Sequence, residues 1–128
     1  MLSRHFQVLT LAAACMLLAV SVGNAETGMY GPEHQRCAGK STPDFEECLS
    51  RYRKAWDRRL DSAYQELLRA NPYADDLRRA QRLWLKFRDA NCHYYGLGEG
   101  TIVRIQAAAC LRYMTQQRAL ELEELLEN

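Results

Sequence analysis

After residue 40, the chain contains three stretches in which apolar residues recur every three or four positions, which is the period of an α-helix. The first stretch follows Ser41 or Thr42, either of which can cap a helix, and Pro43, which suits a first helical turn. Its apolar face comprises Phe45, Cys48, Leu49, Tyr52, Trp56, Leu60, Ala63, Tyr64 and Leu67. The pattern predicts one long helix that ends near Arg69.

The second stretch starts at Asn71, which we expect to cap a helix with Pro72 in its first turn, and ends near Tyr95. The glycines of "GLGEG" then break the pattern, and a third helical stretch continues to the C-terminus. The apolar positions of the two stretches are Tyr73, Leu77, Ala80, Trp84, Phe87 and Asn91, and then Ile102, Ile105, Ala109, Leu111, Met114, Leu122 and Leu125. No alternating strand pattern occurs. The sequence therefore predicts an all-α fold, a small antiparallel bundle of three main helices over residues 41–128.

The first 40 residues lack this pattern. A short positive start is followed by an uncharged apolar run that ends in small residues at Ala25, which is typical of a signal peptide, residues 1–25, and of a periplasmic or secreted protein. An uncleaved membrane anchor is the alternative, because about 20 apolar residues can span a bilayer. The "AAAC" that ends at Cys15 gives a lipoprotein only minor support. Residues 26–40 are polar and glycine-rich, so we expect a loose N-terminal arm pinned by Cys37.

The charge balance excludes one class of partner. Removal of residues 1–25 takes away Arg4 and no acid, so the 17 basic residues of the full chain fall to 16 and balance its 16 acidic ones. A nucleic-acid-binding protein would show a basic surplus or stripe. We therefore expect no nucleic-acid partner, and contact with a membrane only through an uncleaved signal.

Four cysteines, an even number, remain in a small exported chain, which favours two disulfides over free thiols. The predicted topology gathers them at one pole of the bundle. Two pairings compete: Cys37–Cys48 with Cys92–Cys110, or Cys48–Cys92 with Cys37–Cys110. We favour the first because it closes short loops, each contributing about 3 kcal/mol in the chain-entropy model. Its weakness is that Cys110 lies well down a helix that starts at Thr101, whereas a bridge needs Cα atoms within about 7 Å.

Enzymatic and metal sites receive little support. Cys92 and His93 could suggest a nucleophile and its base, but adjacent helical residues do not face each other, and the thiol is expected in a disulfide. Zinc ligation by Cys37, Cys92, His34 and His93 matches no compact ligand spacing. The acidic pairs are neighbours in the sequence, whereas glycosidase chemistry needs two carboxylates across a cleft. We therefore expect no catalytic residue, no metal and no cofactor.

The remaining polar and aromatic residues divide into scaffold and surface. Five aromatic residues lie on the apolar stripes and are expected in the core: Tyr52, Trp56, Tyr64, Trp84 and Phe87. Arg88 and Asp89 either form a half-buried brace with Gln81, Thr115 or Arg118, or are solvated.

Tyr94, Tyr95 and Glu99 flank the glycine break beside the expected disulfides. Tyrosine next to a stapled loop is typical of a recognition surface. The alternative is an ordinary helix end with no partner.

These residues resemble a known family, the LprI-like (lysozyme inhibitor LprI-like) domain, over about residues 37–125. The matching pattern is Cys48, Leu60-Asp61-x-x-Tyr64, Ala80-Gln81-Arg82-x-Trp84-x-x-x-Arg88-Asp89-x-x-Cys92, Cys110 and Thr115-x-x-Arg118-x-x-x-Leu122. The resemblance implies a small, exported, helical protein that inhibits lysozyme. Within the pattern we interpret Tyr64, Trp84, Arg88, Asp89 and Arg118 as scaffold.

Two positions depart from the family. Leu60-Asp61 stands where Leu-Asn is common, and Gly98-Glu99-Gly100-Thr101 stands where Gly-Gly-Ser is common, which alters the loop expected to contact a partner.

The sequence thus favours a non-enzymatic binding protein that inhibits lysozyme or another peptidoglycan hydrolase by occluding its cleft. The alternative is a periplasmic accessory or immunity-type envelope protein with no lysozyme contact.

Overall fold

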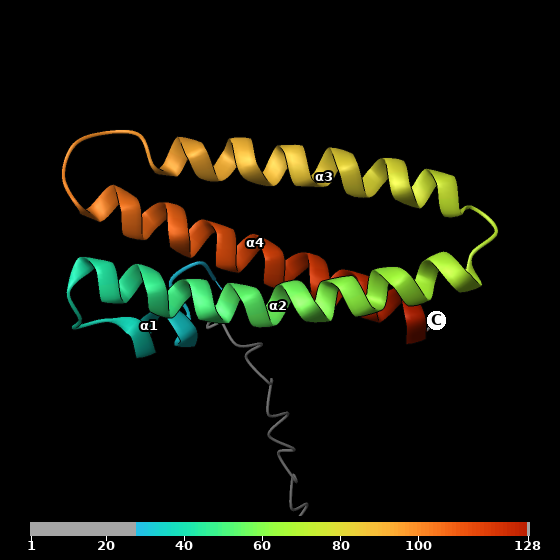
Figure 1. The fold of residues 1–128 in the computed structure, drawn as a ribbon, viewed down its shortest axis with the longest axis horizontal. Coiled ribbons are helices and arrows are strands. Elements are labelled where there is room, and N and C mark those ends of the chain that lie inside the picture. The colour runs from blue at the N-terminus through green and yellow to red at the C-terminus, as the bar shows by residue number, and fades with distance from the viewer. Residues whose placement is uncertain (1–27, 128) are drawn as a thin grey trace, which may run out of the picture.

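The computed structural model describes residues 28–127, so the expected signal peptide lies outside the described residues. They form four helices: α1 (Pro32–Cys37), α2 (Thr42–Ala70), α3 (Ala74–Tyr95) and α4 (Ile102–Glu127). The all-α bundle of three long helices is confirmed, with the short α1 added at its N-terminus (Figure 1). Within residues 28–127, no helix combines the length and the apolar character needed to cross a membrane.

The long helices start and end where local chemistry allows. Ser41 is the N-cap of α2, and its hydroxyl oxygen accepts a hydrogen bond from the backbone N–H of Asp44 over 3.4 Å. Pro43 lies in the first turn, where its missing N–H costs nothing. At the other end, the backbone N–H of Asn71 donates to the carbonyl of Leu67 over 2.9 Å.

The expected cap of the next helix is wrong. α3 begins at Ala74 rather than at Pro72, and its N-cap, Tyr73, makes no capping bond through its side chain. Asn71 instead ends α2, and its side-chain oxygen accepts the backbone N–H of Tyr73 over 2.8 Å. Asparagine side chains often stabilise turns in this way, and the turn takes up the residues that the sequence assigned to the helix.

α4 is the central helix. Its interface with α2 is the most extensive in the bundle, α3 packs mainly on α4, and α2 and α3 touch little (Figure 1). The core between α2 and α4 has two clusters of buried residues. One contains Cys37, Phe45, Cys48, Leu49, Ile105 and Ala109, and the other contains Leu60, Ala63, Leu67, Ala119 and Leu122.

α3 is less buried than its sequence pattern indicates. Only Gln81 and Cys92 are fully buried on it, and Trp84 is half-buried. Phe87, which we expected in the core, has 61% of its surface exposed. The reason is that α3 packs on essentially one neighbour, so only a narrow face is covered, and Phe87 lies about 100° around the helix from its inward-facing neighbour Arg88. The other residues of the expected stripes that prove exposed are Tyr73, Ala80, Ile102 and Leu125.

The N-terminal segment is not the loose arm that we expected. Residues 32–37 form α1, which packs on α2, and Cys37 is fully buried. Glu33 of α1 accepts hydrogen bonds from the indole N–H of Trp56 and from the guanidinium of Arg112. These bonds fix the segment to both α2 and α4.

Candidate functional site

The disulfides pair as the sequence favoured. Cys37 is bonded to Cys48 with Cα atoms 5.7 Å apart, and Cys92 is bonded to Cys110 with Cα atoms 5.4 Å apart. Cys110 can reach Cys92 although it is the ninth residue of α4. The loop extends past the end of α3 before α4 begins, so the ninth residue of α4 lies beside the last turns of α3 (Figure 1). Both bridges therefore lie inside the half of the bundle that carries this loop, about two turns from the start of α4 rather than at the pole itself.

The loop between α3 and α4 has a backbone shape that favours glycine. At the end of α3, the backbone N–H of Gly96 donates to the carbonyl of His93 over 2.9 Å. Gly98 and Gly100 adopt φ angles of +123° and +87°, which other residues rarely adopt. A Cβ atom on Gly96 would lie 3.3 Å from the Cβ of Ala107, so this glycine also lets the loop start close against α4.

The loop carries an exposed, largely apolar set of side chains. We call Tyr94, Tyr95, Leu97, Glu99 and Ile102 the loop surface. Tyr94 is 71% exposed, and its ring meets that of Tyr95 edge-on with centroids 6.0 Å apart. Leu97 and Ile102 are also exposed, and Glu99 forms no ion pair within residues 28–127. The sequence analysis missed Leu97, because a leucine in a glycine loop carries no distinctive signal, and it placed Ile102 on the apolar stripe of the third helix rather than on the surface.

The disulfide next to the loop surface anchors it to the bundle. Cys92 lies two residues before Tyr94, and its bond to Cys110 ties the last turns of α3 to α4. Beside it, the amide of Asn91 donates to the sulfur of Met114 over 3.3 Å. Both contacts hold the last turns of α3, from which the loop departs, against α4.

Arg88 and Asp89 are interlocked at the α3–α4 interface. The side chain of Arg88 is only 12% exposed, and its Nε and Nη2 donate to Asp89 Oδ1 over 2.9 and 2.8 Å. Arg88 Nη1 donates to the hydroxyl of Thr115 over 3.3 Å and lies 3.7 Å from Asp57 of α2. Its guanidinium also lies 5.2 Å from the centre of the Trp84 ring. This geometry fits the half-buried brace for Arg88, whereas the side chain of Asp89 is 63% exposed.

Arg118 forms a second brace, also near Trp84. Its Nε donates to the side-chain oxygen of Gln81 over 3.1 Å, and its Nη1 lies 2.8 Å from Glu121. Its guanidinium lies 6.0 Å from the Trp84 ring, while Tyr64 packs, half-buried, against the core cluster below. These contacts fit a scaffold role for the residues that the family pattern shares.

The sequence prediction missed the most buried charge of the described residues. The side chain of Arg112 is 2% exposed and lies 2.9 Å from Glu33. It also donates to the side-chain oxygen of Gln116 over 2.7 Å and to the backbone carbonyls of Gly28 and Met29 over 3.3 and 2.9 Å. A signal was present, because position 112 continues the three-and-four spacing of the buried stripe from Ala109. A charged residue at a position of the buried helical face indicates a buried ion pair, because an unpaired buried charge is costly.

Arg112 also affects its neighbour His34 on α1. The pKa of this imidazole is lowered from its ordinary value, first by partial burial and then by the nearby positive charge of Arg112. The ring packs against those of Tyr30 and Phe45, with centroids 5.0 and 4.9 Å away. His34 is therefore a neutral packing residue near pH 7.

The Cys92–His93 pair and the candidate metal ligands can be compared with the structure of residues 28–127. Cys92 is in a disulfide and His93 is exposed, so the adjacent pair holds no free thiol. Residues 28–127 contain no cluster of three or more His, Cys, Asp or Glu side chains that could hold a metal ion.

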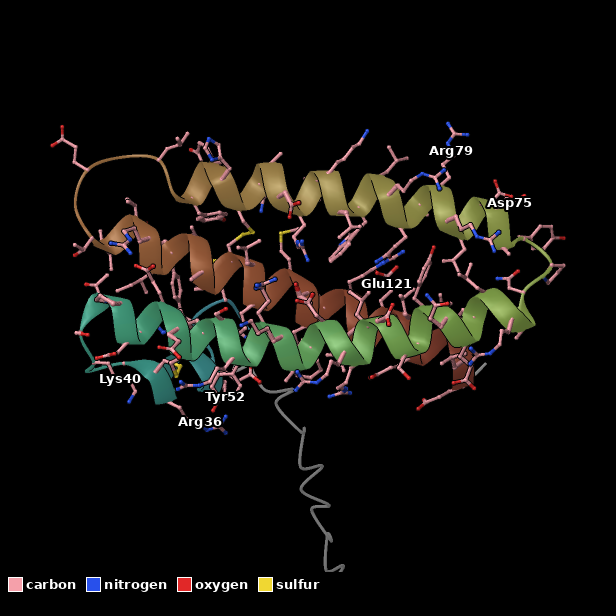
Figure 2. All side chains as sticks on the ribbon, in the orientation of Figure 1. Arg36, Lys40, Tyr52, Asp75, Arg79 and Glu121 are labelled. Carbon is pink, nitrogen blue, oxygen red and sulfur yellow. A yellow bond between two sulfur atoms is a disulfide. The ribbon has the colours of Figure 1, made fainter. Side chains whose placement is uncertain are left out.

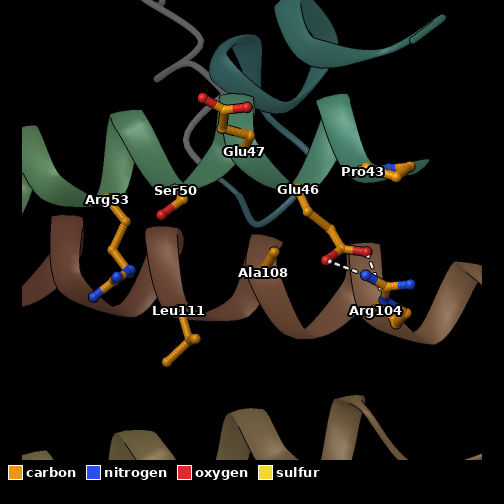
Figure 3. A pocket seen from close by; sticks show the side chains of 8 residues that line it. All are labelled: Pro43, Glu46, Glu47, Ser50, Arg53, Arg104, Ala108 and Leu111. Carbon is orange, nitrogen blue, oxygen red and sulfur yellow. Dashed lines mark hydrogen bonds and ion pairs between the residues drawn. The ribbon is translucent and has the colours of Figure 1, made fainter. Parts of the chain in front are cut away.

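A pocket of about 410 Å³ opens between α2 and α4 (Figure 3). Its charged residues are all ion-paired: Glu46 with Arg104 over 2.8 Å, Glu47 with Arg51 over 3.4 Å, and Arg53 with Asp57 over 3.0 Å. Of its carboxylates, Glu46 is tied to Arg104, while Glu47 lies on the exposed surface. The loop surface is the stronger candidate for contact with a partner.

Comparison with known proteins decides the family. The model of the family described as lysozyme inhibitor LprI matches residues 35–122, which is more than half of the chain. The chain belongs to the LprI family. The LprI match spans α2, α3, most of α4 and all four disulfide cysteines, so it covers both the scaffold and the loop surface.

A curated relative of this LprI-family protein is the uncharacterized protein R02472 of Rhizobium meliloti (strain 1021). The two are 34% identical over 71 residues, which is 54% of this chain and 47% of the relative. The chain thus matches about half of the length of that relative. No solved structure matches.

Proposed function

We propose that this LprI-family protein is an exported, non-enzymatic inhibitor of a peptidoglycan hydrolase, and that it acts by occluding the glycan cleft of the enzyme. The observation that carries the proposal is the loop surface, which is exposed, mostly apolar and anchored by the Cys92–Cys110 disulfide. The family match supports the class of target, because the family model is described as a lysozyme inhibitor. Export rests on the signal-peptide pattern of residues 1–25.

The chemistry of such a cleft suits the loop surface. Glycosidases of this kind place a carboxylic acid and a carboxylate on either side of a groove that binds sugar rings. Tyr94 and Leu97 can fill the apolar parts of such a groove, and the protonated acid can donate a hydrogen bond to the carboxylate of Glu99 or to a tyrosine hydroxyl. Because no glycosidic bond is offered, the enzyme is blocked without turnover.

Anchoring of the loop contributes to affinity. A flexible loop loses conformational freedom when it binds, whereas a loop that is already ordered avoids most of that cost. In this loop, the Cys92–Cys110 disulfide restrains the departing helix and the positive φ angles of Gly98 and Gly100 define the backbone path. We propose that Tyr64, Trp84, Arg88, Asp89 and Arg118 act behind this loop as scaffold and do not contact the enzyme.

The test is a titration of purified residues 26–128 against lysozyme, with clearing of a cell-wall suspension as the readout. The proposal expects clearing to slow in proportion to added protein and to stop near stoichiometric amounts. Because the chain without residues 1–25 has balanced charges, added salt should change inhibition little. Unchanged clearing at large molar excess would reject the proposal for that lysozyme type.

A pull-down from the envelope fraction of the source organism separates this function from the alternative. Capture of a peptidoglycan hydrolase supports inhibition. Capture of another envelope protein, together with a negative lysozyme titration, would identify an accessory or immunity-type protein.

A further inference from the structure

The outward face of α3 carries an apolar row that the fold leaves uncovered. Leu83, Phe87, Ala90 and Tyr94 follow one another at four, three and four positions, so they lie along one side of the helix. All four are exposed, including 57% of Leu83 and 61% of Phe87. The row is about 16 Å long at 1.5 Å per residue. Exposed apolar rows of this length on a soluble domain mark a contact surface.

A basic row runs beside the apolar one. Arg79, Arg82 and Lys86 are exposed and form no ion pair within residues 28–127. Figure 2 shows Arg79 pointing away from the bundle on the outer side of α3. Two of the three acids on this helix are ion-paired, and the third, Asp76, is exposed one turn before Ala80 on the side of the apolar row. Asp75 pairs with Arg78, Asp89 pairs with Arg88, and Asp76 lies in the first turn.

We infer that the outward face of α3 binds anionic lipid headgroups, with the helix lying in the plane of the membrane surface. A helix with Leu, Phe or Tyr on one side and Lys or Arg alongside lies at the boundary of headgroups and acyl chains. The apolar row enters that boundary while the basic row contacts the phosphates. This inference does not depend on the proposed inhibition of a hydrolase.

The composition of the face suits an anionic lipid surface. Between Arg79 and Tyr94 its outward positions are Arg79, Ala80, Arg82, Leu83, Lys86, Phe87, Ala90, His93 and Tyr94, with no acid and no Ser, Thr, Asn or Gln among them. The amides of α3, Gln81 and Asn91, face inward and bond to α4. A lipid surface needs only apolar burial and positive charge, and this face offers both.

A second copy of the chain fits the face poorly. In an antiparallel pair of α3 helices related by a two-fold axis, each flank meets the same flank of the other copy. The row of Arg79, Arg82 and Lys86 would therefore face itself, and like charges in contact are destabilising.

The experiment is co-sedimentation of residues 26–128 with vesicles, since residues 1–25 would themselves bind lipid. Vesicles of equal parts phosphatidylglycerol and phosphatidylcholine should bind the protein, binding should weaken as salt rises, and pure phosphatidylcholine should bind little. Lys86→Gln should weaken partition about fivefold, the amount expected for one cation near an anionic surface. Phe87→Ser should weaken it by at least that factor, and Leu83→Ser provides the second apolar variant.

Matched controls lie on other helices. Lys54 on α2 is exposed and unpaired within the described residues, and Leu125 on α4 is 54% exposed, close to Leu83. Lys54→Gln and Leu125→Ser should leave partition unchanged, and circular dichroism should show the same helicity in all variants.

Three results would overturn the inference. One is equal partition onto neutral and anionic vesicles. Another is Lys86→Gln and Phe87→Ser binding as well as the controls. The third is absence of lipid binding with concentration-dependent dimerisation that Phe87→Ser abolishes, which would assign the face to a second copy. Because Leu83, Lys86 and Phe87 lie outside the loop surface, these outcomes leave the lysozyme titration unaffected.

Discussion

The substitution Glu33→Gln tests whether α1 is held to the bundle by its buried ion pair. It removes the negative charge opposite Arg112 and keeps the size of the side chain and an oxygen that can accept the indole N–H of Trp56. The positive charge of Arg112 then stays buried without an anionic partner.

The expected loss follows from burial. Arg112 is 2% exposed and Glu33 is 16% exposed, so water screens the pair little. Breaking a buried pair by removing one partner costs about 3–5 kcal/mol. Here Arg112 keeps its bonds to Gln116 and to the carbonyls of Gly28 and Met29, so we expect a loss of about 2–3 kcal/mol in the free energy of unfolding.

Urea denaturation followed by far-ultraviolet circular dichroism measures this loss. Glu46→Gln is the matched control, because it removes the same charge from the Glu46–Arg104 pair, in which Arg104 is 58% exposed. A pair with an exposed partner contributes at most about 1 kcal/mol. Arg112→Met in the Glu33→Gln background should restore part of the stability, because no unpaired buried charge remains.

The reasoning is refuted if Glu33→Gln costs no more than Glu46→Gln. That result would mean that Arg112 reaches water in solution and that the N-terminal segment is not fixed to α4. Restored stability in the double variant, after a large loss in the single one, would support the buried pair specifically.

Three further predictions concern the Cys92–Cys110 disulfide, His34 and Gly100. Replacing both Cys92 and Cys110 by Ala should lower the free energy of unfolding by about 3 kcal/mol, the loop-closure value for their sequence separation of 18, measured by urea denaturation without reductant. Because the pKa of His34 is lowered from 6.5, the unfolded chain takes up the proton first as the pH falls. The contribution of neutral His34 to the free energy of unfolding is therefore fully present above about pH 6.5 and is lost as the pH drops toward the pKa of the folded state. The urea midpoint should fall over this pH range, and His34→Gln should remove that fall. Gly100→Ala should cost about 1–2 kcal/mol at its φ of +87°, seen as a lower melting temperature, whereas equal stability would show that the loop relaxes freely.

Local sequence signals predicted the long helices and their bridges. The cap at Ser41 and the acidic first turn of α3 act within a few residues, so they can be recognised without the fold. The pairing of Cys37 with Cys48 and of Cys92 with Cys110 followed from short closed loops in an antiparallel bundle.

The sequence predictions were wrong where contacts between helices determine whether a residue is buried or a segment is ordered. Phe87 lies on a regular apolar stripe, but α3 has essentially one neighbour, and no local pattern shows how many helices will cover a given face. Conversely, α1 is only six residues long and would be marginal alone, so its order depends on the distant Trp56 and Arg112.

The candidate site was predicted in outline only. Tyr94, Tyr95 and Glu99 drew notice because they flank a glycine loop beside a cysteine. The exposure of Leu97 and Ile102 could not be deduced, because it depends on the loop extending past the end of α3.

The central claim, that the anchored loop blocks a peptidoglycan hydrolase, is tested most directly by comparing inhibition constants of loop and control variants. Tyr94→Ala and Leu125→Ala each remove an exposed apolar side chain, 71% and 54% exposed respectively, so both should fold normally. Our account predicts that Tyr94→Ala weakens inhibition of lysozyme about 30-fold, the effect of losing a central aromatic contact, while Leu125→Ala inhibits like the unmodified chain. Equal inhibition by the two variants would contradict it.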